Sequence, residues 1–281
     1  YEPGSTFKPV TVASALEEGV VKDGDTYVCK GFETVADYKL KCHVFSTIGS
    51  HGSLTVEQAL MNSCNPYMIH LALEMGNSRF AYYQSLFGFG KITGIDLPGE
   101  TTGIVYGDRM TTIDAACNSF GQTINVNMMQ MMAAYCSIIN GGMLYQPHIV
   151  KRIESANGEV VKEYKANLVR QTITASTSKL LRRYLKNTVE EGTAKKAGVT
   201  GYSVAGKTGT AQKGDRKDNK WIISFIGHAP AENPKFAIYV VIDEPYGTTG
   251  TSGSSADVLT LTHNILEKLL PYMNVYKDAS D

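Results

Sequence analysis

One stretch decides how this chain folds: Pro3-Gly4-Ser5-Thr6-Phe7-Lys8-Pro9. Its Pro-Gly pair marks a turn, and the apolar run that follows predicts a buried helix over 5–19. Positions three apart share one helix face, so we expect the Lys8 amine to lie above the Ser5 hydroxyl. A serine hydroxyl is a poor nucleophile without a base beside it, and a desolvated lysine can serve as that base. On its own, however, the pattern fits an ordinary helix cap with a surface lysine better.

The composition excludes several classes of function. The 281 residues include 27 Lys+Arg and 27 Asp+Glu, so the formal net charge is zero. This balance argues against a nucleic-acid-binding surface and against a polybasic membrane patch. No run of 18 apolar residues occurs, so we expect no membrane span within the chain. Because Ser5 lies so near the first residue, with no strand before it, we expect the natural N-terminus and any membrane anchor to lie upstream.

The chain divides into two parts of different character. Residues 10–195 are expected to form an all-helical lobe, although 20–53 suggest loops with short strands and 149–165 a hairpin turning at Asn157-Gly158. Residues 200–271 are expected to form antiparallel strands, the third of them central, and a closing helix packed on the sheet. A helix is expected over 54–75 with a break at 63–66, where Asn65 would cap a new helix that begins at Pro66. Further helices are expected over 127–139, 177–192 and 254–270. The expected strands span 202–212, 221–228 and 236–243. This order predicts an α+β fold in a single domain.

Two further motifs accompany the first. Ser63-Cys64-Asn65 lies at a helix break, where side chains can point into a cleft. Gly206-Lys207-Thr208-Gly209-Thr210 lies on a predicted strand whose glycines would let a ligand approach the backbone. The Lys207 amine, with the hydroxyls of Thr208 and Thr210, suits a substrate carboxylate. Each motif alone could be a helix cap or a turn with a surface lysine, but the three together, in this order, favour a catalytic site.

The motifs S-x-x-K, S-x-N and K-T-G in this order resemble the superfamily of penicillin-binding proteins and serine β-lactamases. Within it the chain is most similar to the class B penicillin-binding proteins, which are monofunctional D,D-transpeptidases, of the division and sporulation type (FtsI- or SpoVD-like). The resemblance covers nearly the whole chain. Its further landmarks are His51-Gly52, Phe87-Gly88-Phe89-Gly90, Thr93 to Glu100, Ser119-Phe120-Gly121-Gln122, Asn140-Gly141-Gly142 and Trp221 to Gly227. It implies the penicillin-binding fold, an antiparallel sheet with flanking helices and a helical lobe.

The resemblance also implies a reaction, the cross-linking of peptidoglycan outside the cytoplasmic membrane. Ser5 is then the nucleophile, Lys8 its base and Ser63 the proton relay. Asn65 binds the substrate amide, and Lys207 orients Ser63 and, with Thr208, Gly209 and Thr210, the substrate carboxylate. Stem peptides and β-lactams are the expected ligands, a glycosyltransferase-containing cell-wall complex is the expected partner, and catalysis needs no cofactor. A serine β-lactamase and a β-lactam sensor domain, which would be a binding module, remain as alternatives.

The cysteines are unevenly distributed. Cys29, Cys42, His51 and Cys64 form a Cys3His set of the type that holds structural zinc. The spacing alone favours three buried thiols and a surface histidine, and a Cys29–Cys42 disulfide is a second rival. The resemblance raises the zinc interpretation to equal rank, because some class B relatives carry a zinc ligand at the position of His51. His43 could replace one ligand, whereas Cys117 and Cys136 are expected to be inert core thiols.

Overall fold

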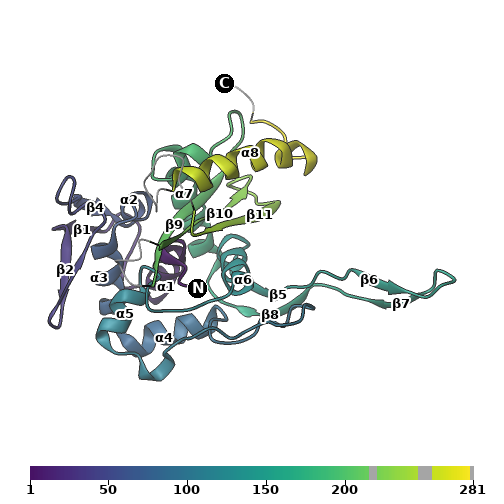
Figure 1. Ribbon diagram of the computed structural model, residues 1–281, viewed down its shortest axis with the longest axis horizontal. Coiled ribbons are helices and arrows are strands. Elements are labelled where there is room, and N and C mark those ends of the chain that lie inside the picture. Colours follow the sequence, from purple (N-terminus) through teal and green to yellow (C-terminus); the bar gives the residue numbers. More distant parts are fainter. Residues whose placement is uncertain (215–219, 246–254, 279–281) are drawn as a thin grey trace.

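A computed structural model describes residues 1–214, 220–245 and 255–278. In this described part the sheet contains β9 (Ala205–Lys213), β10 (Lys220–Ala229) and β11 (Phe236–Asp243), paired antiparallel in the order β11-β10-β9. The expectation that the third strand is central is wrong, because β10 lies between the other two. The apolar side chains of β11 are only half-buried, and α8 (Ala256–Tyr272) packs on the sheet beside them (Figure 1). Ser254, where we expected this helix to begin, lies outside the described residues.

The lobe is built around α1 (Lys8–Glu18), which follows the 3-10 turn η1 (Gly4–Phe7). The α1 residues from Lys8 to Ala15 are all buried, because α1 packs against α3, α6 and α7. The helices that complete the lobe are α2 (Val56–Met61), α3 (Asn65–Met75), α4 (Asn77–Leu86), α5 (Thr112–Asn118), α6 (Met128–Ile139) and α7 (Ala175–Glu190), with short 3-10 turns η2 (Gly107–Arg109) and η3 (Lys195–Ala197). Among the described residues, no helix is long and apolar enough to span a membrane.

The α+β fold is confirmed, but the lobe is not all-helical. Two-stranded ribbons interrupt the helices of the described chain: β1 (Thr26–Cys29) with β4 (Gly52–Thr55), β2 (Phe32–Val35) with β3 (Tyr38–Lys41), β5 (Met143–Gln146) with β8 (Asn167–Gln171), and β6 (Arg152–Glu154) with β7 (Val160–Glu163). The last ribbon is the hairpin expected at Asn157-Gly158, and it projects far from the body in Figure 1. Short, mostly exposed strands of this kind leave little hydrophobic periodicity to read.

Helix α7 joins the two parts of the molecule. Its residues Leu181, Tyr184 and Leu185 belong to the large apolar core around α1. Val189, one turn further on, belongs to a second core between the sheet and α8. The chain then reaches β9 through η3, so α7 sets the position of the K-T-G strand relative to the lobe.

Candidate active site

The nucleophile candidate Ser5 lies on η1, wedged between the sheet and the loop after α5. The Gly4 N–H donates to the Gly121 carbonyl at 2.9 Å, which fixes one side of the turn. On the other side β9 approaches so closely that a Cβ on Gly4 would lie 2.5 Å from the Thr210 carbonyl oxygen. Gly4 also has a φ of +57°, which favours glycine. Ser5 itself is half-buried at the edge of a cleft.

Lys8, the residue that follows this turn, is fully buried. Its amine donates to the Ser63 carbonyl at 2.6 Å, to the Ser63 hydroxyl at 3.0 Å and to Asn65 Oδ1 at 2.7 Å. The expected contact with the Ser5 hydroxyl is not among the hydrogen bonds of the described residues, because the three acceptors draw the amine toward the junction of α2 and α3. Burial lowers the pKa of Lys8 to about 8, so part of the population carries a neutral amine near neutral pH.

The S-x-N motif forms that junction. Ser63 has a φ of +53°, which is strained for a residue with a side chain and is typical of functional sites. Asn65 was expected to cap α3, but Cys64 holds the cap position and Asn65 is the first helical residue. The Asn65 amide is used differently, because Oδ1 accepts from Lys8 and Nδ2 donates to the Lys41 carbonyl at 3.3 Å.

The K-T-G strand supplies a second buried cation. The Lys207 amine donates to the Thr208 carbonyl at 3.1 Å and contacts the Thr208 hydroxyl at 3.4 Å. Burial, and then the charge of Lys8, holds the pKa of Lys207 well below its usual range. No carboxylate in the described residues pairs with Lys207, so an anion that reached it would relieve an unfavourable buried charge.

The glycines of this motif have a different role from the one expected. A Cβ at Gly206 would lie 2.3 Å from the Phe225 ring, and one at Gly209 would lie 2.5 Å from Ser224 Oγ. Both glycines therefore admit neighbouring parts of the protein itself rather than a ligand. Among the predicted substrate-binding residues, Thr208 and Thr210 line the cleft, whereas Gly209 packs against β10 and η1.

The cleft has a volume of about 830 Å³ and brings the three motifs together. Several residues that line the cleft had no predicted role, among them Lys39, Lys41, Thr193 and Gln212. Thr193 links two motifs, because its N–H donates to the Met61 carbonyl at 3.1 Å and its hydroxyl lies 3.4 Å from the Thr208 hydroxyl. Its position just after the predicted end of α7 was the one signal available.

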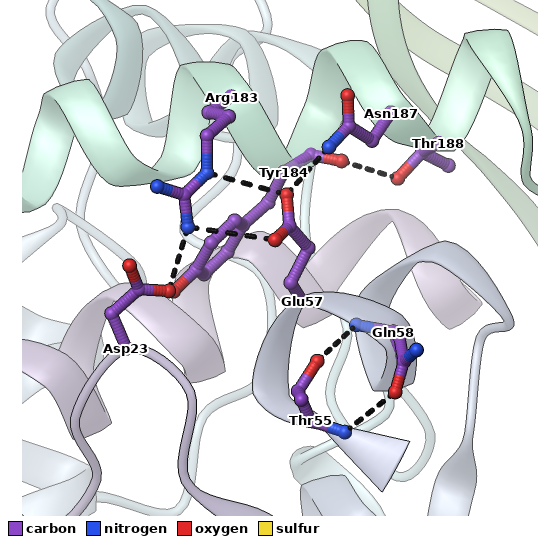
Figure 2. Close-up of polar contacts among 8 residues, drawn as sticks. All are labelled: Asp23, Thr55, Glu57, Gln58, Arg183, Tyr184, Asn187 and Thr188. Atoms are coloured by element: carbon purple, nitrogen blue, oxygen red, sulfur yellow. Dashed lines mark hydrogen bonds and ion pairs between the residues drawn. The ribbon is translucent and has the colours of Figure 1, made fainter.

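A polar network joins α2, which leads to the S-x-N motif, to α7, which leads to the K-T-G strand (Figure 2). The Arg183 guanidinium on α7 contacts Asp23 at 2.6 Å and Glu57 on α2 at 3.4 Å. Asn187 donates to Glu57 at 2.6 Å, and the Tyr184 hydroxyl donates to Asp23 at 2.7 Å. Since α2 leads to Ser63 and α7 leads to β9, this network fixes the S-x-N motif relative to the K-T-G strand.

Behind the cleft the structure gathers the four predicted metal ligands. The ligand atoms of Cys29, Cys42, His51 and Cys64 all lie within 4.8 Å of one another. His51 Nδ1 lies 3.6 Å from the Cys42 sulfur and 3.8 Å from the Cys29 sulfur. In tetrahedral zinc with bonds of about 2.3 Å to sulfur and about 2.05 Å to nitrogen, the two ligand atoms are about 3.6 Å apart. The donor set and its geometry therefore fit zinc.

The structure also bears on the other interpretations of the cysteines. All five cysteines lie in the described residues as free thiols, so the Cys29–Cys42 disulfide is not formed in this structure. His43 Nδ1 lies 3.8 Å from the Cys42 sulfur but outside the close group of four. Cys117 and Cys136 are half-buried and not fully in the core as expected, but burial still raises the pKa of each to about 11, which suits unreactive thiols.

Comparisons with known proteins identify the family of the chain. The family described as the penicillin-binding protein transpeptidase domain matches residues 1–267. Stage V sporulation protein D of Bacillus subtilis is 41% identical to this chain; the match covers 98% of this chain and 43% of that protein. The peptidoglycan D,D-transpeptidase FtsI of Escherichia coli K12 is 32% identical; the match covers 99% of this chain and 45% of that protein.

Solved structures are similar throughout the chain. Penicillin-binding protein 3 of Mycobacterium tuberculosis, in complex with aztreonam, has a TM-score of 0.88 and 29% identity, covering 99% of this chain and 64% of its own. The same protein with ampicillin has a TM-score of 0.89 and 29% identity, covering 100% of this chain and 64% of its own. The chain thus spans less than half the length of the curated relatives named above. The chain belongs to the penicillin-binding protein transpeptidase family.

Proposed function

We propose that this chain is a serine D,D-transpeptidase domain that cross-links peptidoglycan stem peptides and is acylated by β-lactams. One observation carries the proposal: the buried Lys8 amine is bound to Ser63 and Asn65, which line the same cleft as Ser5. This arrangement joins a base and a proton relay in one hydrogen-bonded group at the cleft that Ser5 also lines. The names of the curated relatives and the β-lactam complexes of penicillin-binding protein 3 support the same reaction.

In the acylation step the Ser5 oxygen attacks the carbonyl carbon of the penultimate D-Ala. The neutral Lys8 amine takes the serine proton, since it has a lone pair and can still donate to two of its three acceptors. As the C–N bond breaks, Lys8 returns a proton through the Ser63 hydroxyl, 3.0 Å away, to the departing D-Ala amine. The products are free D-Ala and an ester on Ser5.

In the second step the amine of another stem peptide attacks the ester carbonyl. It loses a proton through the same relay, the ester C–O bond breaks, and Ser5 regains its hydroxyl proton. By analogy with the family, the backbone N–H groups of Ser5 and Thr210 stabilise the oxyanion in both steps. The close approach of β9 to η1 at Gly4 supports this pairing.

The K-T-G strand orients the substrate in this scheme. Lys207, Thr208 and Thr210 bind the C-terminal carboxylate, and Asn65 binds the amide of the acyl chain. The absence of a described carboxylate partner for Lys207 supports this role, because the substrate would supply the missing charge. A β-lactam carries a carboxylate or sulfonate that can take the same place.

We further propose a structural zinc ion held by Cys29, Cys42, His51 and Cys64. Zinc would supply no catalysis, because four protein ligands leave no open coordination position. Cys64 lies between Ser63 and Asn65, so the four side chains would fix the 29–51 region against the S-x-N motif. The S–N distances given above support the proposal.

The wider setting is proposed from the relatives. The domain acts at the extracytoplasmic face of the membrane, held by an anchor outside this chain, in a division or sporulation complex with a glycosyltransferase partner. Within the domain, a lobe over about 10–195 and a sheet with its closing helix over about 200–271 form the two walls of the cleft.

Two assays test this function against its alternatives. Steady-state hydrolysis of a chromogenic cephalosporin, at many turnovers per chain, would indicate a β-lactamase instead. Cross-linking of stem peptides with release of D-Ala separates a transpeptidase from a β-lactam sensor, which would be acylated without releasing D-Ala. We expect one slow acylation event per chain with the cephalosporin and measurable D-Ala release with the peptides.

A further inference from the structure

The β2–β3 ribbon places two lysines at the wall of the cleft. Lys41 pairs with Phe32 and Lys39 with Thr34, so the alternation of side chains puts both lysines on one face of the ribbon. Both are exposed, and both line the cleft. The Lys39 amine lies 3.7 Å from the centre of the Phe32 ring, and the Lys41 amine lies 4.8 Å from the Phe45 ring.

Within the described part of the chain, these two cations have no carboxylate partner. Neither lysine forms an ion pair with a carboxylate in residues 1–214, 220–245 or 255–278. Glu33 on the same ribbon pairs with Leu40 on the opposite face, and the Tyr27 hydroxyl donates to it. In a chain of zero net charge, two cations on one wall that no described carboxylate pairs with are a local feature that attracts anions.

The lysines are tied to the catalytic group through the backbone. Asn65 Nδ2 donates to the Lys41 carbonyl at 3.3 Å, while its Oδ1 accepts from Lys8 at 2.7 Å. Cys42, next in the chain, lies in the close group with Cys64 beside Asn65. The ribbon backbone at Lys41 is therefore fixed beside Asn65 and, through Asn65, beside Lys8, as a binding subsite requires.

We propose that Lys39 and Lys41 form a subsite for a carboxylate in the acyl chain of the donor peptide, so that the domain selects an acidic stem peptide. The proposal rests on the proposed function. There the C-terminal carboxylate lies at Lys207, and the acyl chain leaves in the other direction past Asn65, whose neighbour is Lys41. A lysine amine is a point charge on a flexible stem and accepts a carboxylate without strict geometry.

Two penicillins test the subsite: one whose side chain ends in a carboxylate, built from a six-carbon diacid, and its terminal carboxamide. In the full chain, at low salt, we expect the acid to acylate Ser5 faster than the amide. Each lysine should contribute about two- to five-fold to that ratio, as exposed ion pairs do. The ratio should fall to about one in the double variant Lys39→Gln/Lys41→Gln, remain in Lys39→Arg/Lys41→Arg, and shrink at high salt.

The control is Lys162→Gln. Lys162 also lies over an aromatic ring, 4.4 Å from that of Tyr164, but on the β6–β7 hairpin that projects from the body (Figure 1). It should keep the wild-type ratio. A wild-type ratio of acid to amide acylation rates in the double glutamine variant overturns the subsite. Equal losses of acylation rate with the acid, the amide and benzylpenicillin also overturn it, because they indicate that the ribbon only supports the cleft. Failure of benzylpenicillin to acylate the wild-type protein would instead defeat the proposed function.

Discussion

Gly4→Ala should damage acylation far more than its effect on stability alone would suggest. The new Cβ would lie 2.5 Å from the Thr210 carbonyl oxygen, whereas an ordinary contact begins near 3.4 Å. The turn that carries Ser5 and the strand β9 must then separate by about 0.9 Å. A misplacement of about 1 Å can cost about 100-fold in rate, because the nucleophile and the oxyanion donors lose their alignment.

The chain offers a matched control in Gly19→Ala. Gly19 ends α1 with a φ of +77°, and a Cβ there would meet nothing within 4 Å. Both variants have the strain of a left-handed alanine, about 1 kcal/mol, but only Gly4→Ala adds the overlap with β9. We expect Gly19→Ala to lower Tm by about 2–4 °C and to acylate at the wild-type rate. We expect Gly4→Ala to lose about 2–4 kcal/mol of unfolding free energy in total.

The assay is the second-order rate of acylation by a fluorescent penicillin, followed by in-gel fluorescence at 20 °C, where both variants should be folded. Urea unfolding of each variant supplies the stability difference. If Gly4→Ala acylates within about three-fold of Gly19→Ala, the contact between β9 and the nucleophile turn does not align the catalytic groups, and the reasoning is wrong.

Three further predictions concern buried charges and the metal. Lys207→Ala should slow acylation by carboxylate-bearing β-lactams about 10- to 150-fold, the equivalent of about 1.5–3 kcal/mol for a hydrogen bond to a charged group, and a wild-type rate would refute the carboxylate role. Burial lowers the pKa of His228 to about 4, and its Nε2 lies 3.1 Å from the Ala231 carbonyl. An unfolded histidine takes up its proton near pH 6.5, so His228 should destabilise the fold progressively from pH 6.5 down to pH 4, by about 3 kcal/mol in all. Urea unfolding of His228→Asn should therefore show a smaller loss of unfolding free energy over this pH range. A loss equal to that of the wild-type protein would argue against this role of His228. Elemental analysis should find about one zinc per chain, and chelation or Cys64→Ser should lower Tm and acylation together, whereas a metal-free protein with an unchanged Tm after chelation would contradict the zinc site.

Short motifs predicted which residues share the cleft, because the chemistry of such motifs depends on residue identity. The three motifs do meet at one cleft, although they are separated by more than 50 and more than 140 residues of sequence. Thr193 and Lys41 were missed for a physical reason: each is held by a residue far away in the sequence, Thr193 by the Met61 carbonyl and Lys41 by the side-chain amide of Asn65. No local pattern records such a contact.

The wrong predictions about the fold have a similar origin. The apolar β11 was expected at the centre of the sheet, but its side chains are apolar because they pack against α6 and α8. Hydrophobicity reports burial of a face and not the number of paired neighbours. The glycines of the K-T-G motif were interpreted as room for a ligand, whereas Phe225 and Ser224 occupy that space. Strand order and cross-strand neighbours are tertiary facts, and single-sequence periodicity cannot supply them.

The central claim is that Ser5 is the acylated nucleophile, and peptide mapping of a β-lactam adduct tests it most directly. The protein would be incubated with benzylpenicillin, digested and analysed by mass spectrometry. We predict one adduct per chain, on Ser5, which is absent in Ser5→Ala and strongly reduced in Lys8→Ala although both variants remain folded. An adduct that persists in Ser5→Ala, or one that maps to another residue, would contradict the account.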